Sequence, residues 1–164
     1  MLLDRESMIS AEQPDWSRED ITRFWEPGKK LIRAIRRHQA ARHKGGVLGR
    51  IAAKYWALVH LFWSTITQSE IHLKTEIGGG LRLPHPTGIV IYPLAKIGPN
   101  CMIFHQVTLA DKVTVGGHVD IGAGAKILGP LTIGDHAQIG ANAVVTKDVP
   151  ANSTAVGIPA KIIR

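Results

Sequence analysis

Cysteine is nearly absent from this sequence of 164 residues, in which Cys101 is the only one. A single thiol cannot form a disulfide framework. No stretch is long and apolar enough to cross a bilayer, and the first ten residues carry charges where a signal peptide would have an apolar segment. We therefore expect neither a membrane span nor a signal peptide, and the expected compartment is the cytoplasm.

Acidic residues are missing from residues 29–54, which contain nine Lys or Arg. Aromatic residues are few, at 5% of the chain, and all four tryptophans lie within the first 70 residues. Beyond residue 70 there are eight basic and five acidic residues, and no basic groove interleaved with aromatics. This composition argues against a nucleic-acid-binding protein.

The sequence instead has a strong six-residue period. A β-branched residue or leucine recurs at every sixth position, namely Ile91, Ile97, Ile103, Leu109, Val115, Ile121, Ile127, Ile133, Ile139 and Val145. Four residues after each stands a small or aliphatic residue, namely Ala95, Cys101, Val107, Val113, Val119, Ala125, Leu131, Ala137, Ala143 and Val149. This period fits neither a strand, which repeats about every two residues, nor a helix, which repeats about every 3.6.

Each six-residue unit offers a large inward residue, a turn and a small inward residue. Such a unit cannot bury its own apolar face, and stacking on copies of itself solves this problem. Cys101 takes a small inward position, and we interpret it as a buried core residue rather than a nucleophile. An earlier series, Ile71, Ile77, Leu83 and Ile89, is out of phase by two residues, which predicts an insertion near residues 88–90.

The repeat resembles that of the hexapeptide-repeat acyltransferases over roughly residues 71–157. The resemblance implies an all-β fold, a left-handed parallel β-helix at residues 71–164, after a short N-terminal α-helical segment at residues 1–70. In that family CoA lies in a groove between neighbouring subunits of a trimer. The resemblance therefore also implies acetyl-CoA as co-substrate and a homotrimer or a multiple of trimers.

The N-terminal segment shows helical patterns and no repeat. DWSREDI is typical of a helix start, with Ser17 as the cap. Apolar residues follow at helical spacing, namely Val47, Ile51, Tyr55, Leu58, Val59, Phe62 and Ile66. We interpret this helix as a cover for the open lower edge of the β-helix, because a bare edge invites aggregation. A compatible alternative is peripheral contact of the basic region 29–66 with an anionic membrane face.

Two histidines are candidates for catalysis from their positions. His85 and His105 each lie two residues after a large inward residue, and one coil plus the insertion separates them. Both should project from the same outward face of adjacent coils, where paired imidazoles can serve as an acid–base site. His118 and His136 fall near turns, and we interpret them as surface residues.

The segment GGGLRLPHPTGIVI resembles the active-site signature of the serine acetyltransferase branch of that family. The resemblance implies that His85 is the general base and that Glu70, in EIH, orients it. His105 is either a contact to the acceptor or a second base. Transfer from acetyl-CoA would be direct, because no acyl-enzyme nucleophile is apparent. The residues implied for CoA binding are Ala123 in IGAGA, Ala141 in IGANA, Lys147 and Lys161.

The acceptor side departs from that branch. The serine enzymes carry a long loop with an Arg-His pair, whereas VTLADKVTVGG here continues the repeat, and Asp111 and Lys112 fall nearest to the missing pair. The acid that precedes their catalytic histidine is Pro84 here. These losses favour O-acetylation of a sugar or polysaccharide precursor, as in the short colanic-acid or exopolysaccharide O-acetyltransferases. We therefore expect a glycan or nucleotide-linked sugar to be a better acceptor than L-serine.

Two alternatives stay open. Serine O-acetylation for cysteine biosynthesis is the main one, with Arg82 as the arginine left to bind the carboxylate. A non-enzymatic β-helix scaffold is the minor one. We expect no metal, because twelve residues separate His105 from His118, too many for the histidine pair of the trimeric carbonic anhydrases that share this fold.

Overall fold

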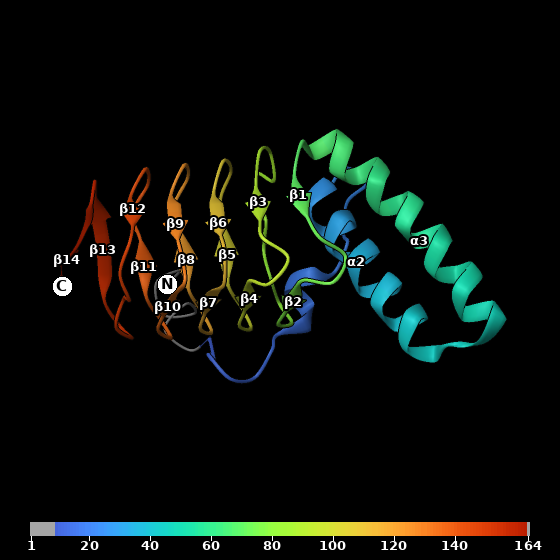
Figure 1. Ribbon diagram of the computed structural model, residues 1–164. Helices are drawn as coiled ribbons and strands as arrows, with labels where there is room; N and C mark the ends of the chain where they lie inside the picture. The colour runs from blue at the N-terminus through green and yellow to red at the C-terminus, as the bar shows by residue number, and fades with distance from the viewer. Residues whose placement is uncertain (1–8, 164) are drawn as a thin grey trace.

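The chain folds into a parallel β-helix with three flat faces, and two α-helices lie at one end of it (Figure 1). The structure is a computed structural model and describes residues 9–163. The charges at positions four to six, on which the prediction about a signal peptide rests, lie outside the described part. No helix within residues 9–163 combines the length and apolarity needed to cross a membrane.

Three sheets form the faces, and each coil of the chain contributes to all of them. Face A consists of β1 (Glu70–Ile71), β3 (Val90–Ile91), β6 (Thr108–Ala110), β9 (Lys126–Leu128) and β12 (Val144–Val145). Face B consists of β2 (Glu76–Ile77), β4 (Lys96–Ile97), β7 (Val113–Val115) and β10 (Leu131–Ile133). Face C consists of β5 (Met102–Ile103), β8 (Asp120–Ile121), β11 (Gln138–Ile139), β13 (Thr154–Gly157) and β14 (Ala160–Ile163). Only β13 and β14 pair antiparallel among these strands, and the expected left-handed parallel β-helix is confirmed.

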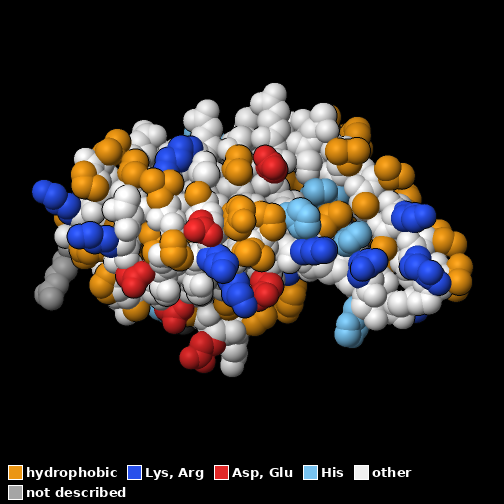
Figure 2. Space-filling model, in the orientation of Figure 1, with side chains coloured by type: hydrophobic (Ala, Val, Ile, Leu, Met, Phe, Trp, Pro, Cys, Tyr) orange, Lys and Arg blue, Asp and Glu red, His pale blue; other side chains and the backbone are white. Residues whose placement is uncertain are grey.

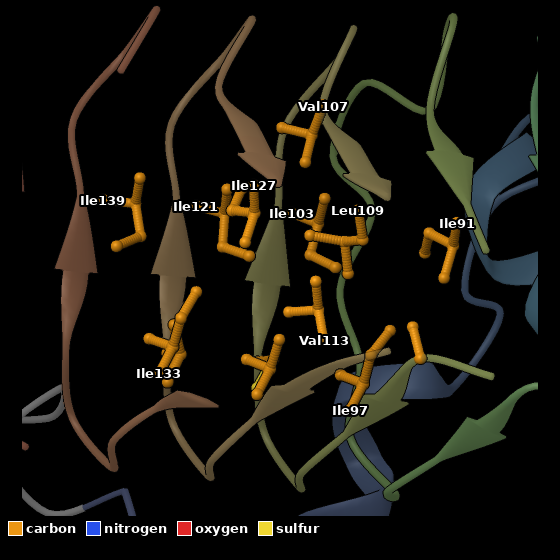
Figure 3. Close-up of a cluster of buried hydrophobic side chains, with 14 of the residues drawn as sticks. Ile91, Ile97, Ile103, Val107, Leu109, Val113, Ile121, Ile127, Ile133 and Ile139 are labelled. Atoms are coloured by element: carbon orange, nitrogen blue, oxygen red, sulfur yellow. The ribbon is translucent and has the colours of Figure 1, made fainter. Parts of the chain in front are cut away.

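The core is a set of stacked columns of inward side chains (Figure 3). On face A, Ile91 pairs with Leu109 and Leu109 with Ile127, so one inward residue lies directly above another. Every large and every small residue of the two repeat series is buried, which confirms the inward pattern. Burying one such aliphatic side chain stabilises the fold by roughly 1.5–3 kcal/mol.

Strand register shows where the repeat changes phase. Arg82 pairs with Met102, so the separation there is 102 − 82 = 20 residues, whereas Val90 pairs with Thr108, at 108 − 90 = 18. Two extra residues therefore enter between Arg82 and Val90. Ile89 is buried and belongs to the small-residue series of the later coils, not to the earlier series that its spacing also fits.

The extra residues form a bulge at Pro84–Pro86 with His85 at its centre. Thr87 already occupies a regular corner position, because its carbonyl accepts the Gln106 N–H at 2.9 Å. The predicted insertion point at residues 88–90 is therefore wrong by a few residues. The consequence is that His85 lies on the one coil corner of this column that departs from the repeat.

Helix α2 (Pro27–Lys44), not α3 (Gly46–Thr67), covers the open end of the β-helix. Leu31, Ile32 and Ile35 of α2 are buried in the same core as the strands. Helix α3 packs on α2, where its buried residues are the small Gly49 and Ala53, and Trp63 is partly buried against the core. The apolar residues predicted to cover the edge are mostly exposed, namely Val47, Ile51, Tyr55, Leu58, Phe62 and Ile66. They contribute to the apolar rim over α3 in Figure 2.

The segment before α2 lies against the first coils. The side chain of Asn100, which is buried, accepts the Asp15 N–H at 2.8 Å and donates to the carbonyls of Ser10 and Gln13. The predicted helix start is wrong: residues 16–19 form a single 3₁₀ turn, η1 (Trp16–Glu19), and Asp15 rather than Ser17 is its cap. These contacts fasten the segment to the β-helix.

The carboxylate of Glu19 fixes the end of η1. It binds the Arg36 guanidinium at 2.8 Å and accepts the backbone N–H groups of Gly80 and Leu81 at 2.8 and 3.2 Å. Arg36 also donates to the Gly78 carbonyl at 2.6 Å. The residue before Glu19, Arg18, is thereby held against the outer surface of face C.

Candidate active site

The corner between faces C and A carries the predicted site residues His105, Ala123 and Ala141, and His85 lies in the bulge just before it. Thr87, His105, Ala123 and Ala141 occupy this corner in successive coils, and backbone hydrogen bonds of 2.8–2.9 Å join each coil to the next. His85 projects from the bulge just before Thr87. In the first coils this corner therefore carries two histidines, and in the later coils it carries small residues.

The two imidazoles meet at this corner. The ring centroids of His85 and His105 lie 6.1 Å apart, with an angle of 78° between the rings. His85 is exposed, whereas His105 is partly buried. Nδ1 of His105 is buried and has no hydrogen-bond partner among residues 9–163. An exposed imidazole can exchange a proton with a ligand. A buried nitrogen without a partner can form a hydrogen bond to a ligand.

Glu70 does not hydrogen-bond to His85 within residues 9–163. It lies in β1 opposite Val90 and is exposed on the outside of face A, whereas His85 belongs to the corner. Ser69, the residue before β1, contacts the bulge through its hydroxyl, which donates to the Pro86 carbonyl. The orienting role of Glu70 stays a prediction, and Ser69 is a contact that the sequence did not indicate.

The four residues predicted to bind CoA do not lie on one surface of the subunit. Ala123 is partly buried and Ala141 is exposed, and both continue the histidine corner. Lys161 is exposed on β14, at the last edge of face C. Lys147 follows β12 and lies at the corner between faces A and B. Within one subunit, Lys147 therefore lies on a different part of the surface from the other three residues.

Cys101 points into the core and is fully buried. Its thiol donates to the Gly116 carbonyl at 3.1 Å. Burial raises the pKa of the Cys101 thiol to about 12, so the thiolate needed for nucleophilic attack does not form near neutral pH.

Replacing Cys101 with serine should leave acetyl transfer intact. A serine hydroxyl can keep the hydrogen bond to the Gly116 carbonyl, so we expect only a modest loss of stability. The measurement is the steady-state rate of CoA release by the variant and its parent. Loss of transfer together with a trapped thioester on Cys101 would contradict direct transfer.

His118 and His136 lie together at the corner between faces B and C, away from the other pair. Their Nδ1 atoms are 2.9 Å apart, and both residues have a left-handed backbone at the turn. Across residues 9–163 no group of three or more His, Cys, Asp or Glu side chains could hold a metal ion.

Two of the cavities beside the first coils border α2. The larger, of about 1150 Å³, lies between α2 and face B and is lined by neither His85 nor His105. The smaller, of about 430 Å³, is enclosed by η1, the start of α2 and Arg82–Pro84. Its wall ends at Pro84, the residue before His85, and His85 itself does not line it. Arg18 also lines it, a residue that no sequence motif indicates.

Comparison with known proteins gives one consistent result. No family model matches the chain. The serine acetyltransferase of Mycobacterium tuberculosis is 40% identical over 125 residues, which cover 71% of this chain and 52% of that protein. The serine acetyltransferase of Helicobacter pylori strain J99 is 46% identical over 106 residues, 60% of this chain and 62% of that protein. The chain thus spans between about half and three fifths of these relatives.

Solved structures agree with the sequence comparison. A serine acetyltransferase in complex with CoA matches with a TM-score of 0.72 and 33% identity, over 85% of this chain and 57% of that one. Soybean serine acetyltransferase complexed with serine matches with a TM-score of 0.70 and 34% identity, over 84% and 57%. In sequence over its repeats and in fold over most of its length, this chain is similar to serine acetyltransferases.

Proposed function

We propose that this protein transfers the acetyl group of acetyl-CoA to the hydroxyl oxygen of L-serine, with His85 as general base. The observation that carries the proposal is the His85–His105 pair at the foot of a column of small residues, in a chain similar to serine acetyltransferases. Two of the similar structures are complexes, one with CoA and one with serine. These relatives favour serine, the alternative from the sequence, over the sugar acceptor that the missing loop predicts.

In the proposed reaction the acceptor hydroxyl and the thioester meet beside His85. The imidazole takes the hydroxyl proton while the oxygen attacks the thioester carbonyl carbon. A C–O bond forms and the C–S bond breaks, and the proton then passes from the imidazolium to the departing CoA thiolate. The products are an O-acetyl ester and CoA, with His85 returned to its neutral form. Nδ1 of His105 has an unused hydrogen-bonding capacity that suits the acceptor.

A sugar hydroxyl is the second candidate acceptor, on one specific observation. The chain between β6 and β7 consists only of Asp111 and Lys112, so no loop covers the outer surface there. An open surface admits a larger acceptor, and a sugar needs no cation for a carboxylate. The relatives do not support this reading, and it depends on the missing loop alone.

Activity with defined acceptors tests the proposal. We expect L-serine to give a kcat/KM of about 10⁴ M⁻¹s⁻¹ or more, in the usual range for enzymes. Mono- and oligosaccharides and nucleotide sugars at equal concentration should give far less. The measurement is CoA release with a thiol reagent. Faster turnover with a sugar would replace serine by the second candidate, and absence of CoA binding would favour a scaffold.

We propose a trimer for the assembled protein. Lys147 lies one corner away from Ala123 and Ala141, and a CoA molecule between two copies of the chain could contact Lys147 of one copy and the alanines of the other. Light scattering should give three times 17.8 kDa or a multiple of it. An active monomer would contradict this arrangement.

The outer side of α3 is proposed to contact an anionic membrane surface. Leu58, Phe62 and Ile66 are among its exposed apolar residues, and Arg50 and Lys54 flank them. A second copy would bring these like charges together, whereas anionic lipids would neutralise them. Co-sedimentation with vesicles containing phosphatidylserine, but not with neutral vesicles, is the expected result. A larger oligomer without vesicle binding would point to a second copy instead. The cytoplasmic location stays a prediction.

A further inference from the structure

The cavity beside the His85 bulge is rich in positive charge. Three cations line it, Arg18, Lys29 and Arg82, against one acid, Glu26. Glu26 is already satisfied, because it binds the Lys29 ammonium at 2.8 Å and accepts the backbone N–H groups at residues 22 and 23. These contacts hold the pKa of the Glu26 carboxyl at about 2. Glu26, the one acid that lines the cavity, is therefore already paired with groups other than the two guanidinium groups.

Arg18 has buried hydrogen-bond donors without acceptors. Its Nε and Nη1 are buried and have no partner among residues 9–163. Burial lowers the pKa of the Arg18 guanidinium, and the nearby charge of Arg82 lowers it further. Asp15 and Asp120 are close enough to raise that pKa, but neither supplies an acceptor for the two buried nitrogens. A buried donor without a partner costs stability, and an anion bound here would remove that cost.

The first turn of α2 forms part of the wall of the same cavity. Gly28 lies so close to the first coil that a Cβ there would stand 2.4 Å from the Leu83 carbonyl oxygen. This approach brings the first turn of α2 into the wall of the cavity. Glu26, the N-cap residue, makes no side-chain capping bond, so the first N–H groups of α2 keep their positive potential.

The wall of the cavity adjoins the bulge that carries His85. This wall runs through Arg82, Leu83 and Pro84, and His85 is the next residue. A carboxylate held between two guanidinium groups would leave the rest of a small amino acid to extend past Pro84 toward the base. Arginine suits this task because its planar fork matches a carboxylate.

We infer that this cavity is the binding site for the acceptor's carboxylate, with Arg18 and Arg82 as its two cations. The inference rests on the proposed function and deepens it, since it assigns carboxylate recognition to the N-terminal segment and the first coil. No loop between β6 and β7 is then needed for that task. Arg18 and Arg82 act as specificity-determining residues, and the proton transfer belongs to His85.

Kinetics of charge-removing variants test the inference. Arg18→Met and Arg82→Met should each raise the KM for L-serine about 10- to 100-fold, as expected for the loss of a charge-assisted hydrogen bond. The kcat and the KM for acetyl-CoA should change little. Arg23→Met removes one exposed positive charge from the same segment and should behave like the parent protein. Arg18→Lys keeps the charge without the fork and should recover part of the loss.

A second acceptor shows whether the carboxylate itself is recognised. L-Serinamide has the hydroxyl but no carboxylate, so the parent protein should use it poorly. Arg18→Met and Arg82→Met should use it as well as the parent does, and L-serine should fall to the same level. The inference is overturned if both variants keep the parent KM for L-serine, or if they lose serinamide turnover equally.

Calorimetric titration separates this inference from the proposed function. The probes are L-serine and inorganic phosphate, added to the full chain without acetyl-CoA. If the parent protein fails to acetylate L-serine yet binds it, and Arg18→Met abolishes binding, the carboxylate site stands and the proposed function falls. If phosphate binds and L-serine does not, the site takes a phosphate ester and the inference is wrong. If neither binds to the parent protein, the inference is equally wrong.

Discussion

The His85→Ala variant is expected to lose most of its activity, with kcat lower by about 10²- to 10⁴-fold, the range for losing a general base. The imidazole of His85 is exposed on the bulge, and its ring centroid lies 6.1 Å from that of His105. The KM for acetyl-CoA should change little, because the small-residue column lies above the bulge. Steady-state CoA release with saturating acetyl-CoA measures the effect.

Two further histidine variants serve as comparisons. His136→Ala removes an exposed histidine at the opposite corner and should leave kcat unchanged. His105→Ala should cost less than His85→Ala and should act mainly on the KM of the acceptor, because its buried Nδ1 can hold a ligand. A His85→Ala variant that kept more than a tenth of the parent kcat would rule out His85 as the general base.

The Ile127→Ala variant is expected to lose about 2–5 kcal/mol of unfolding free energy, the usual cost of truncating a fully buried aliphatic side chain. Ile127 is completely buried and pairs with Leu109 below it and Val145 above it. Its removal opens a cavity in the column that both neighbouring coils share. Each coil of a solenoid depends on contacts with its neighbours, so the defect weakens two interfaces.

The adjacent residue provides the matched comparison. Leu128 lies in the same strand with 45% of its surface exposed, against 0% for Ile127. Leu128→Ala should therefore change the unfolding free energy by less than about 1 kcal/mol. Urea denaturation followed by circular dichroism gives both values. Equal losses in the two variants would mean that the stacked columns do not dominate stability.

The repeat region was predictable because its structure is local. An inward residue every sixth position specifies the three-faced coil, and residues in one register, such as Ile103 and Ile121, must then stack. The closeness of His85 to His105 follows from the same arithmetic. The position of Ile89 also shows that the insertion precedes this residue, because Ile89 lies six residues before Ala95 and so fits the later small-residue series. If Ile89 is assigned to that series, the insertion must lie before residue 89, where the bulge is found.

The N-terminal half of the site could not be read in this way. Residues 9–20 have no period, and their position depends on contacts with residues far along the chain, such as the bond from Asp15 to Asn100. No pattern in the sequence indicates that Arg18 lies beside Arg82, 64 residues further along the chain (82 − 18 = 64). The choice of α2 over α3 as the end cover was equally hidden, because both helices have an apolar side.

The sequence by itself determined the β-helix, its buried columns and the pair of histidines at one corner, because stacking repeats a short-range pattern. Only the tertiary structure decided that most large apolar residues of α3 stay exposed, and that Arg18 and Arg82 line one cavity next to the His85 bulge. The physical reason is that these features arise where unlike elements pack. The energy of such contacts depends on residues that are far apart in the sequence, and the spacing of nearby residues does not predict which of them come into contact.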